Sequence, residues 1–163
     1  MRRQALIVGG GIGGLCAAIC LRLTGWDVQV FEQAPEITEI GAGLQISPNG
    51  VKILEHIGVM ERLESAVFEP EAIEIRMGVS GRPILYLPMK GVAAQRWGAR
   101  YLQVHRADLI TALSARLDAL QPGAMQTGCP VRGYAPCKDG AEVILTNGRR
   151  IQADLVIGAD GIH

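Results

Sequence analysis

Three glycines and one acid near the N-terminus have the types and spacing to hold a dinucleotide. Gly9, Gly11 and Gly14 form the pattern G-x-G-x-x-G, and Glu32 follows them. In such a pattern the first glycine permits a tight turn, the second lets the backbone approach a pyrophosphate, and the third lets a helix pack closely on a strand. An acid about 20 residues further on accepts hydrogen bonds from ribose hydroxyls. These four residues therefore predict a dinucleotide site.

The segments around the glycines have the patterns of the elements that must position them. Residues 5–8 are a short apolar run, typical of a strand buried in a parallel sheet. Apolar residues recur at helical spacing over 12–23, and Gly25 ends that helix. A second strand over 28–32 ends in the acid. An ordinary glycine-rich loop is disfavoured, because strand, turn, helix, strand and acid occur in the required order.

The bulk composition restricts the classes of function. Sixteen basic and sixteen acidic residues cancel, and aromatic residues make up 4% of the chain, so we expect neither nucleic acid nor a membrane surface as a partner. The uncharged run over 5–21 superficially matches a secretory signal or a membrane anchor. Its glycines stand at turn spacing, however, and a span needs about 20 apolar residues. We therefore expect no membrane span.

The four cysteines do not have the spacing of a metal site. Cys16 and Cys20 would lie on the apolar face of the first helix, where small buried side chains are expected. Cys129 and Cys137 form no C-x-x-C pair, and no histidine stands at ligand spacing. We expect no metal, and free thiols favour a reducing, cytoplasmic compartment.

The middle of the chain predicts a second group of elements. Ser47 and Pro48 are residues that favour the start of a helix, at the N-cap and the first helical position, and Gly58 favours its end. A strand over 101–105 is expected to lead into a helix that begins at Arg106. Further expectations are a glycine-bearing approach over 40–46, a hairpin formed by 72–77 and 83–87, and an irregular segment over 88–100.

The C-terminal part predicts a β-meander followed by a buried strand. Strand-like runs near 125–137, 141–146 and 149–153 are separated by Asp-Gly and Asn-Gly pairs, which favour hairpin turns. Residues 154–157 again have a buried-strand pattern, and Asp160 follows them. Such a strand would join the parallel sheet and bring Asp160 to the ligand crevice. A simple turn at Asp160 is the equally weighted alternative.

Four motifs, in order along the whole chain, resemble the FAD-dependent aromatic hydroxylases. These are single-component flavoprotein monooxygenases related to salicylate, 3-hydroxybenzoate and 6-hydroxynicotinate hydroxylases. The motifs are the glycine pattern with residues 32–34, then residues 41–49, 105–109 and 153–161.

The resemblance implies an α/β, Rossmann-like FAD-binding fold with a parallel sheet, a crossover β-meander over 124–153 and a small hairpin excursion over 71–100. The excursion would begin the substrate-side sheet. Residues 1–163 would then be a partial FAD-binding domain, an N-terminal fragment truncated before the substrate domain is complete.

The resemblance also implies which residues contact the cofactor. Residues around Gly13 would lie under the FAD pyrophosphate, Glu32 would hold the adenosine ribose, and Val131 would give backbone contacts to adenine. Some relatives carry a histidine with a proposed catalytic role at the position of Gln45, so the catalytic residue stays unknown and Gln45 is a weak candidate near the flavin. The expected cofactor contacts are Gly9, Gly11, Ile12, Gly13, Gly14, Glu32, Gln33, Gly43, Gln45, Arg106, Val131 and Asp160.

The activity implied for a complete relative is hydroxylation of a small phenolic or heteroaromatic substrate. NADH or NADPH would reduce FAD, and the reduced flavin would react with dioxygen to form a C4a-hydroperoxide that transfers one oxygen atom. The 163-residue chain alone is expected to be inactive, and a homodimer is open for the full-length protein. Two other readings stay open: a Rossmann-type NAD-dependent dehydrogenase or reductase, and a non-catalytic flavin-binding fragment.

Overall fold

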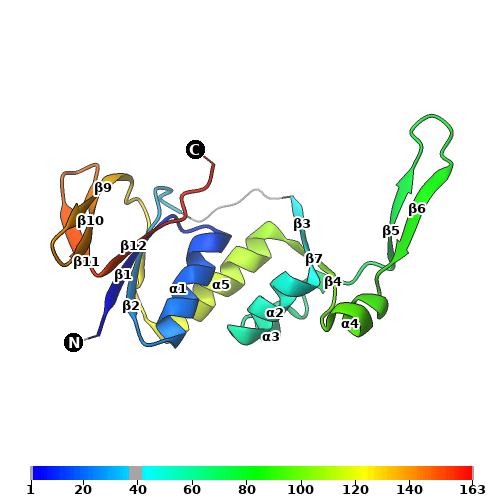
Figure 1. Cartoon of the computed structure of the whole chain (residues 1–163), viewed down its shortest axis with the longest axis horizontal. Helices are drawn as coiled ribbons and strands as arrows, with labels where there is room; N and C mark the ends of the chain where they lie inside the picture. The colour runs from blue at the N-terminus through cyan, green and yellow to red at the C-terminus, as the bar shows by residue number, and fades with distance from the viewer. Residues whose placement is uncertain (1, 37–41, 163) are drawn as a thin grey trace. The chain divides into compact units, whose positions relative to one another are not determined.

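A computed structural model describes residues 2–36 and 42–162, and the chain divides into two compact units (Figure 1). Unit 1 combines residues 1–39 with residues 110–163, and unit 2 comprises residues 40–109. Unit 2 is therefore an insertion between the two segments of unit 1.

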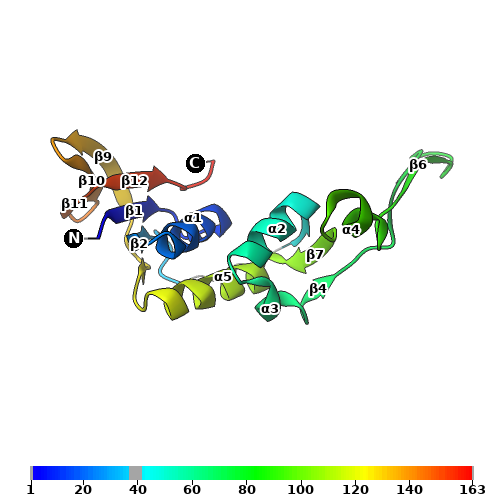
Figure 2. The same cartoon turned by 60° about the horizontal axis from the view of Figure 1, so that its bottom comes forward.

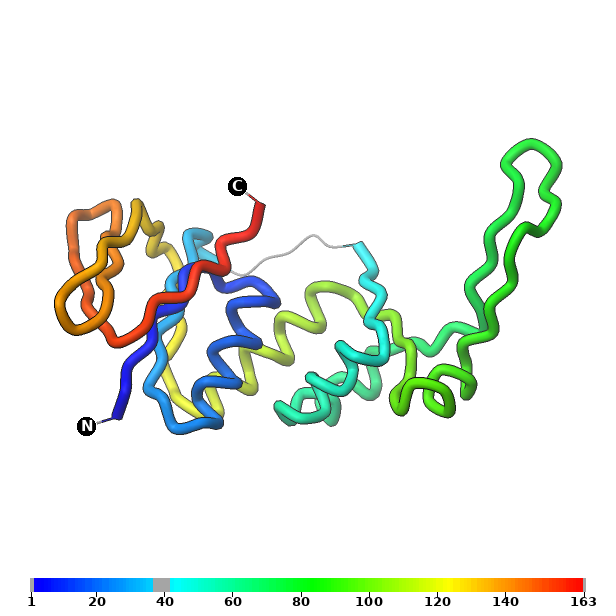
Figure 3. Tube along the Cα trace, in the orientation of Figure 1, coloured from blue at the N-terminus to red at the C-terminus, as the bar shows by residue number. Residues whose placement is uncertain are grey.

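Unit 1 is built on a four-stranded parallel sheet. Its strands are β1 (Gln4–Val8), β2 (Asp27–Phe31), β8 (Met125–Gln126) and β12 (Leu155–Gly158), in the order β12-β1-β2-β8. In Figure 3 the first and last strands, blue and red, run side by side. The predicted parallel sheet is confirmed, including the late strand that returns beside β1.

The two faces of this sheet are covered by different elements (Figure 2). Helix α1 (Ile12–Leu23) covers the face that carries Ile7, because a Cβ on Gly14 of the helix would lie 3.3 Å from the Ile7 side chain. The other face carries Leu6, which packs with Val143 and Leu145 of the second sheet. Successive side chains of a strand point to opposite faces, so β1 is buried on both sides.

Helix α1 begins and ends where its glycines require. Gly11 is its N-cap, and the buried face carries Leu15 and Ile19. At the other end Gly25 has a φ of +91°, and its N–H donates to the carbonyl of Arg22. A positive φ at this position is the usual glycine termination of a helix.

The second sheet of unit 1 is the expected meander, with one correction. Strands β9 (Val131–Cys137), β10 (Gly140–Leu145) and β11 (Arg150–Ala153) pair antiparallel in the order β11-β10-β9. The expected run near 125–137 is not one strand, since β8 pairs with β2 in the parallel sheet. Gly128, with a φ of +63°, and Pro130 interrupt the chain between β8 and β9.

Unit 2 contains a small antiparallel sheet, a hairpin and short helices. The sheet has the order β3-β7-β4, from β3 (Gly43–Ile46), β7 (Leu102–His105) and β4 (Val67–Phe68). The hairpin pairs β5 (Ala72–Arg76) with β6 (Pro83–Pro88). Helices α2 (Pro48–His56) and α3 (Met60–Leu63) lie between β3 and β4 in sequence, and α5 (Arg106–Leu120) begins in unit 2 and continues into unit 1.

The expectation of an irregular segment over 88–100 is wrong. Helix α4 (Val92–Trp97) forms there, bounded by Gly91 with a φ of +72° and Gly98 with a φ of +76°. Ala93 is buried in a small cluster with Met89 and Tyr101. Gly91 and Gly98, which suggested an irregular chain, instead bound a short helix at its two ends. Burial of Ala93 stabilises this helix.

Candidate functional site

The glycine turn after β1 has no room for side chains on its inner side. Gly9 has a φ of +106°, and a Cβ there would lie 2.3 Å from the carbonyl oxygen of Ala159. A Cβ on Gly14 would lie 1.9 Å from the carbonyl oxygen of Gly9. These contacts would be severe clashes for any other residue type. The turn therefore brings β1, α1 and the chain after β12 within backbone contact.

The outer side of the same turn is open. A Cβ on Gly11 or on Gly13 would meet nothing within 4 Å. Gly11 caps α1 without a side-chain hydrogen bond, the first turn of the helix carries no acid, and Ile12 at its first position is half-buried. The N–H groups of a first helical turn have no acceptors within the helix, and they attract anions. The geometry suits a phosphate group that approaches the backbone closely.

Glu32 stands at the end of β2 and contacts this turn. Its Oε2 accepts a hydrogen bond from the Gly10 N–H at 2.6 Å, and its Oε1 accepts one from the Ala34 N–H at 2.8 Å. An ionised carboxylate offers about four lone pairs, so both oxygens keep capacity for further donors such as ribose hydroxyls. Gln33 beside it is exposed.

Gly10 is a site residue that the sequence prediction missed. A Cβ on Gly10 would lie 2.9 Å from the Cβ of Glu32, so only glycine lets the acid approach the turn. Position 10 is a variable position of the G-x-G-x-x-G pattern, which is why the pattern gave it no role. The uninterrupted glycine run from Gly9 to Gly11 is the sequence feature that could have indicated a role for Gly10.

Asp160 and Val131 lie on the same side of unit 1 as the glycine turn. Both line a cavity of about 540 Å³, together with Val8 of β1. The N–H of Ala159 donates to the carbonyl oxygen of Val8 at 2.7 Å, which holds the chain before Asp160 against the end of β1. Asp160 is exposed. The returning strand thus brings Asp160 beside the turn, and a contact of Asp160 with a ligand there stays a prediction.

The remaining predicted contacts belong to unit 2. Gly43 and Gln45 lie on β3, where Gly43 pairs with His105 of β7. Gln45 is exposed, and its Oε1 accepts a hydrogen bond from the Tyr101 hydroxyl at 2.7 Å. Arg106 is half-buried at the first position of α5, and its backbone N–H donates to Ala42. Gly41, the other glycine of this approach, lies outside the described residues.

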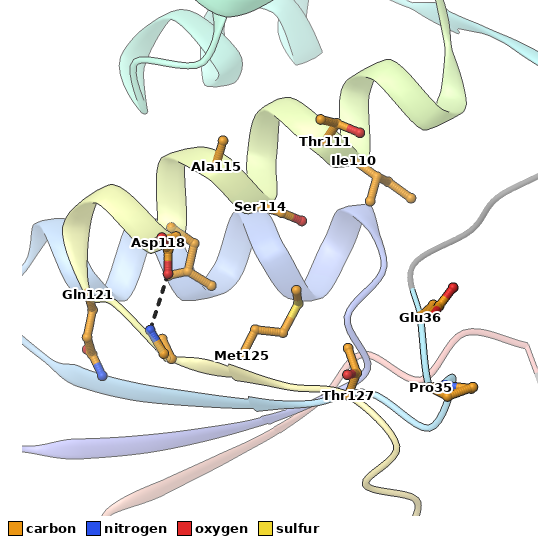
Figure 4. Close-up of a pocket in the computed structure, with 13 residues that line it drawn as sticks. Pro35, Glu36, Ile110, Thr111, Ser114, Ala115, Asp118, Gln121, Met125 and Thr127 are labelled. Atoms are coloured by element: carbon orange, nitrogen blue, oxygen red, sulfur yellow. Dashed lines mark hydrogen bonds between the residues drawn. The ribbon is translucent and has the colours of Figure 1, made fainter.

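A cavity of about 590 Å³ in unit 1 contains none of the predicted site residues. It lies between α5 and the segment around β8 (Figure 4). Within it the Asp118 carboxylate accepts a hydrogen bond from the Gly123 N–H at 3.2 Å, and the buried Ser114 hydroxyl has no partner among the described residues. One unsatisfied hydroxyl does not define a ligand, so this cavity adds nothing to the site.

The expectation that Cys16 and Cys20 are both buried on α1 is wrong for Cys20, which is exposed, whereas Cys16 is half-buried. All four cysteines are free thiols, and burial together with neighbouring Cys20 raises the pKa of the Cys16 thiol to about 11. Over residues 2–36 and 42–162, no three metal-ligating side chains cluster. No helix in these ranges combines the length and apolar character needed to cross a bilayer.

Comparison with known proteins identifies a family over nearly the whole chain. The family described as FAD binding domain matches residues 2–163. The chain is 39% identical over 157 residues to 3-amino-4-hydroxybenzoate 2-monooxygenase of Streptomyces cremeus, covering 96% of the chain and 39% of that enzyme. It is 34% identical over 160 residues to 6-hydroxynicotinate 3-monooxygenase of Pseudomonas fluorescens, covering 96% of the chain and 40% of that enzyme.

A solved structure agrees with this assignment. The crystal structure of Klebsiella pneumoniae HpxO with FAD and uric acid superposes with a TM-score of 0.82 and 32% sequence identity, over 98% of the chain and 39% of HpxO. The chain thus spans about two fifths of the length of the relatives it matches. The predicted resemblance and fold class are confirmed.

Proposed function

The chain belongs to the FAD-binding domain family, and from this premise we propose that it is the FAD-binding portion of an NAD(P)H-dependent flavoprotein monooxygenase. The complete enzyme would hydroxylate a small phenolic or heteroaromatic substrate with dioxygen. Residues 1–163 would be a partial FAD-binding domain, in which the excursion over 71–100 begins the substrate-side sheet and 124–153 form the meander. A cytoplasmic location and a homodimer of the full-length protein belong to the same proposal.

The observation that carries this proposal is the open backbone of the glycine turn beside Glu32. Space is free above Gly11 and Gly13, and the first turn of α1 carries no acid to repel a phosphate. These features fit a pyrophosphate, and the spare lone pairs of Glu32 fit a ribose. The chain therefore carries a cradle of the right chemistry for the adenosine diphosphate half of FAD.

The residues that would hold the cofactor fall into two sets. In unit 1, the backbone of residues 9–14 would bind the pyrophosphate, Glu32 and Gln33 would bind the ribose, and Val131 and Asp160 would border the same ligand. In unit 2, Gly43, Gln45 and Arg106 would contact FAD or the substrate.

The bound flavin would supply redox chemistry that no side chain of this chain can perform, namely hydride acceptance from NADH or NADPH and oxygen transfer from dioxygen. The protein would bind, orient and shield the cofactor. Gln45, an amide, can donate hydrogen bonds to an acceptor atom but cannot serve as a general base at neutral pH. No catalytic base is assigned to this chain.

A flavin titration tests the proposal. Purified protein is mixed with FAD, desalted and examined by visible absorption, with a parallel titration by NAD. We expect flavin bands that persist after desalting, and we expect Gly11→Ala to lose them while its circular dichroism spectrum stays native, because the added methyl group occupies the phosphate space. Tight NAD binding without affinity for FAD would instead support the dehydrogenase reading.

A further inference from the structure

The cavity of about 590 Å³ between α5 and the segment around β8 is formed within unit 1, to which all its described lining residues belong. Its volume is within the usual range for small-molecule sites. None of the predicted cofactor contacts lines it. A ligand in this cavity would therefore occupy a second site, apart from the proposed FAD cradle.

One wall of the cavity is apolar. Ile110 and Leu117 of α5 and Ala124, which precedes β8, are each 2% exposed. The Met125 side chain extends from β8 toward α5 (Figure 4). Methionine is unbranched and flexible, so it adapts to the shape of a neighbouring group. A hydrocarbon group placed against this wall would leave water, which favours its binding.

Two hydrogen-bond acceptors of α5 lie beside this wall. Ser114 and Asp118 are four residues apart, so they are neighbours on one face of the helix. The Asp118 carboxylate accepts from the Gly123 N–H at 3.2 Å through Oδ1, and Oδ2 has no partner in the described part of the chain. The cavity thus offers a carboxylate oxygen that is free to accept a hydrogen bond from a ligand.

The Ser114 hydroxyl is the second acceptor. Its oxygen is buried and has no hydrogen-bond partner among residues 2–36 and 42–162. A buried polar group without a partner is costly, so a donor near it is favourable. Neighbouring atoms cover this oxygen, and a ligand would reach it after a change of the serine χ1 rotamer. Because the hydroxyl has no hydrogen bond to lose, that rotation costs little.

The charge at the cavity has one sign. Glu36 and Asp118 line it, and no lysine, arginine or histidine is among its described lining residues. The last turn of α5 carries no basic residue, and the C-terminal end of a helix has partial negative charge. Arg22 donates to the Leu120 carbonyl at 3.4 Å, but it pairs with Asp27 at 2.9 Å and does not line the cavity. The cavity therefore favours a cation.

The wall at the end of α5 is held in place without a ligand. The Gln121 Oε1 accepts from the Val28 N–H at 3.1 Å, and the Gln121 Nε2 donates to the Val28 carbonyl at 2.8 Å. These two hydrogen bonds tie the chain after α5 to β2. A wall that is already ordered lowers the entropic cost of binding.

We propose that this cavity binds an aliphatic amine in its ammonium form, with the ammonium on Asp118 and Ser114 and the hydrocarbon against the apolar wall. An ammonium has three N–H donors and no acceptor, so it can serve both oxygens at once. A carboxylate ligand would be repelled by the two acids, and an alcohol would gain nothing from their charge. The inference goes beyond the proposed function and does not depend on it.

Titration with n-hexylammonium chloride tests the inference. At pH 7 an alkylamine, like a lysine side chain with a pKa of about 10.4, is protonated. In heteronuclear NMR spectra of the whole chain, the Gly123 amide should shift to saturation, because it donates to Asp118. 1-Hexanol, the neutral analogue, should bind about fivefold more weakly, the range of an exposed ion pair. Sodium hexanoate should bind more weakly than 1-hexanol.

A matched pair of acid variants separates the charge of Asp118 from nonspecific attraction. Asp118→Asn keeps an oxygen for the Gly123 N–H and removes the charge, so it should abolish the preference for hexylammonium over hexanol. Asp139→Asn alters an exposed acid of unit 1 outside the cavity and should keep that preference. An unaltered preference in Asp118→Asn would overturn the inference, as would equal binding of the two compounds to the native protein or the lack of a saturable Gly123 shift.

Two further measurements locate the amine. Ser114→Ala should weaken hexylammonium binding by about fivefold without loss of stability, because the removed hydroxyl has no partner in the free protein. Saturating FAD should leave the hexylammonium affinity unchanged, since no proposed FAD contact lines the cavity. Displacement of the amine by FAD would place it in the cofactor cradle and contradict the inference, whether or not the proposed function is correct.

Discussion

The hydroxyl of Tyr101 donates a hydrogen bond to Oε1 of Gln45 at 2.7 Å. This contact fixes which end of the Gln45 amide faces the protein. The nitrogen, with its two N–H donors, must lie on the side away from Tyr101, on an exposed part of β3. Gln45 therefore presents donors, which suits an acceptor atom of a flavin or of a substrate.

Removing that hydroxyl should expose the coupling between the two residues. We expect Tyr101→Phe to lower the free energy of unfolding by about 1 kcal/mol, the usual value of a partly buried hydrogen bond. Because the partner would already be lost, Gln45→Ala should cost less in the Tyr101→Phe background than in the native protein. Urea unfolding of the four proteins of this double-mutant cycle measures the coupling. Strictly additive effects would show that the contact contributes nothing.

The two neighbouring glycines at the start of α1 should respond in opposite ways. Gly14→Ala places a Cβ 1.9 Å from the Gly9 carbonyl oxygen, so the helix must move off the strand, and we expect a loss of about 3 kcal/mol in unfolding free energy. Gly13→Ala meets no atom within 4 Å and should leave stability unchanged or raise it by about 0.5–1 kcal/mol.

Flavin binding provides the second readout for this pair. If the pyrophosphate lies over the open side of the turn, Gly13→Ala should weaken FAD binding by about tenfold, or ~1.4 kcal/mol, without loss of stability. Flavin fluorescence titration measures this. Unaltered affinity in Gly13→Ala would place the phosphates elsewhere.

Glu32 should contribute to stability as well as to binding. Glu32→Gln replaces one of two acceptor oxygens with an amide donor, so one of the contacts to Gly10 and Ala34 must be lost. We expect about 1.5–3 kcal/mol of destabilisation, the range for hydrogen bonds to charged groups, and weaker FAD binding. The exposed Glu36 offers the same substitution nearby as a control. Equal effects of the two variants would deny Glu32 a specific role.

The buried thiol of Cys16 predicts a dependence of stability on alkaline pH. Burial raises its folded pKa from 9.0 to about 11, and the neighbouring Cys20 adds to the shift. The folded state then binds more protons than the unfolded state between these values, so the stabilising effect is complete below pH 9 and is lost as the pH rises towards 11. Thermal unfolding between pH 8.5 and 11 should show the decline, and Cys16→Ala should reduce it.

Alkylation provides an independent check on the same thiol. Iodoacetamide at pH 8 should modify exposed Cys20 well before Cys16, because the thiolate is the reacting form. Peptide mass mapping over time distinguishes the two sites. Faster modification of Cys16 would contradict the raised pKa.

The local parts of the fold and site were predictable from sequence, and the distant contacts were less so. The turn over residues 9–14 needs glycine for reasons within one strand and one helix, so its pattern was visible directly. The role of Gly10 could not be predicted, because it depends on the side chain of Glu32, which follows the neighbouring strand β2. Likewise β8 was assigned to the meander, since its two residues carry no sign of pairing with β2.

Helix α4 was missed for a different reason. Glycines such as Gly91 and Gly98 are common in irregular segments, so the sequence suggested no helix here. In the structure both have a positive φ and stand at the two ends of the short helix α4, as its N-cap and C-cap. The division into two units was also invisible, because the insertion over 40–109 has no change in composition at its borders.

The pairing of β1 with β12 determines when the parallel sheet can be completed during synthesis. Ala5 lies opposite Leu155, so β1 leaves the ribosome well before the strand that pairs with it on this side. At about 5–20 residues per second the delay is roughly 8–30 s. During that time β1 can pair only with β2, while residues 40–109 are already available to form their own unit. Until β12 is made, the edge of β1 that it covers stays unpaired, and an unpaired strand edge can pair with another chain.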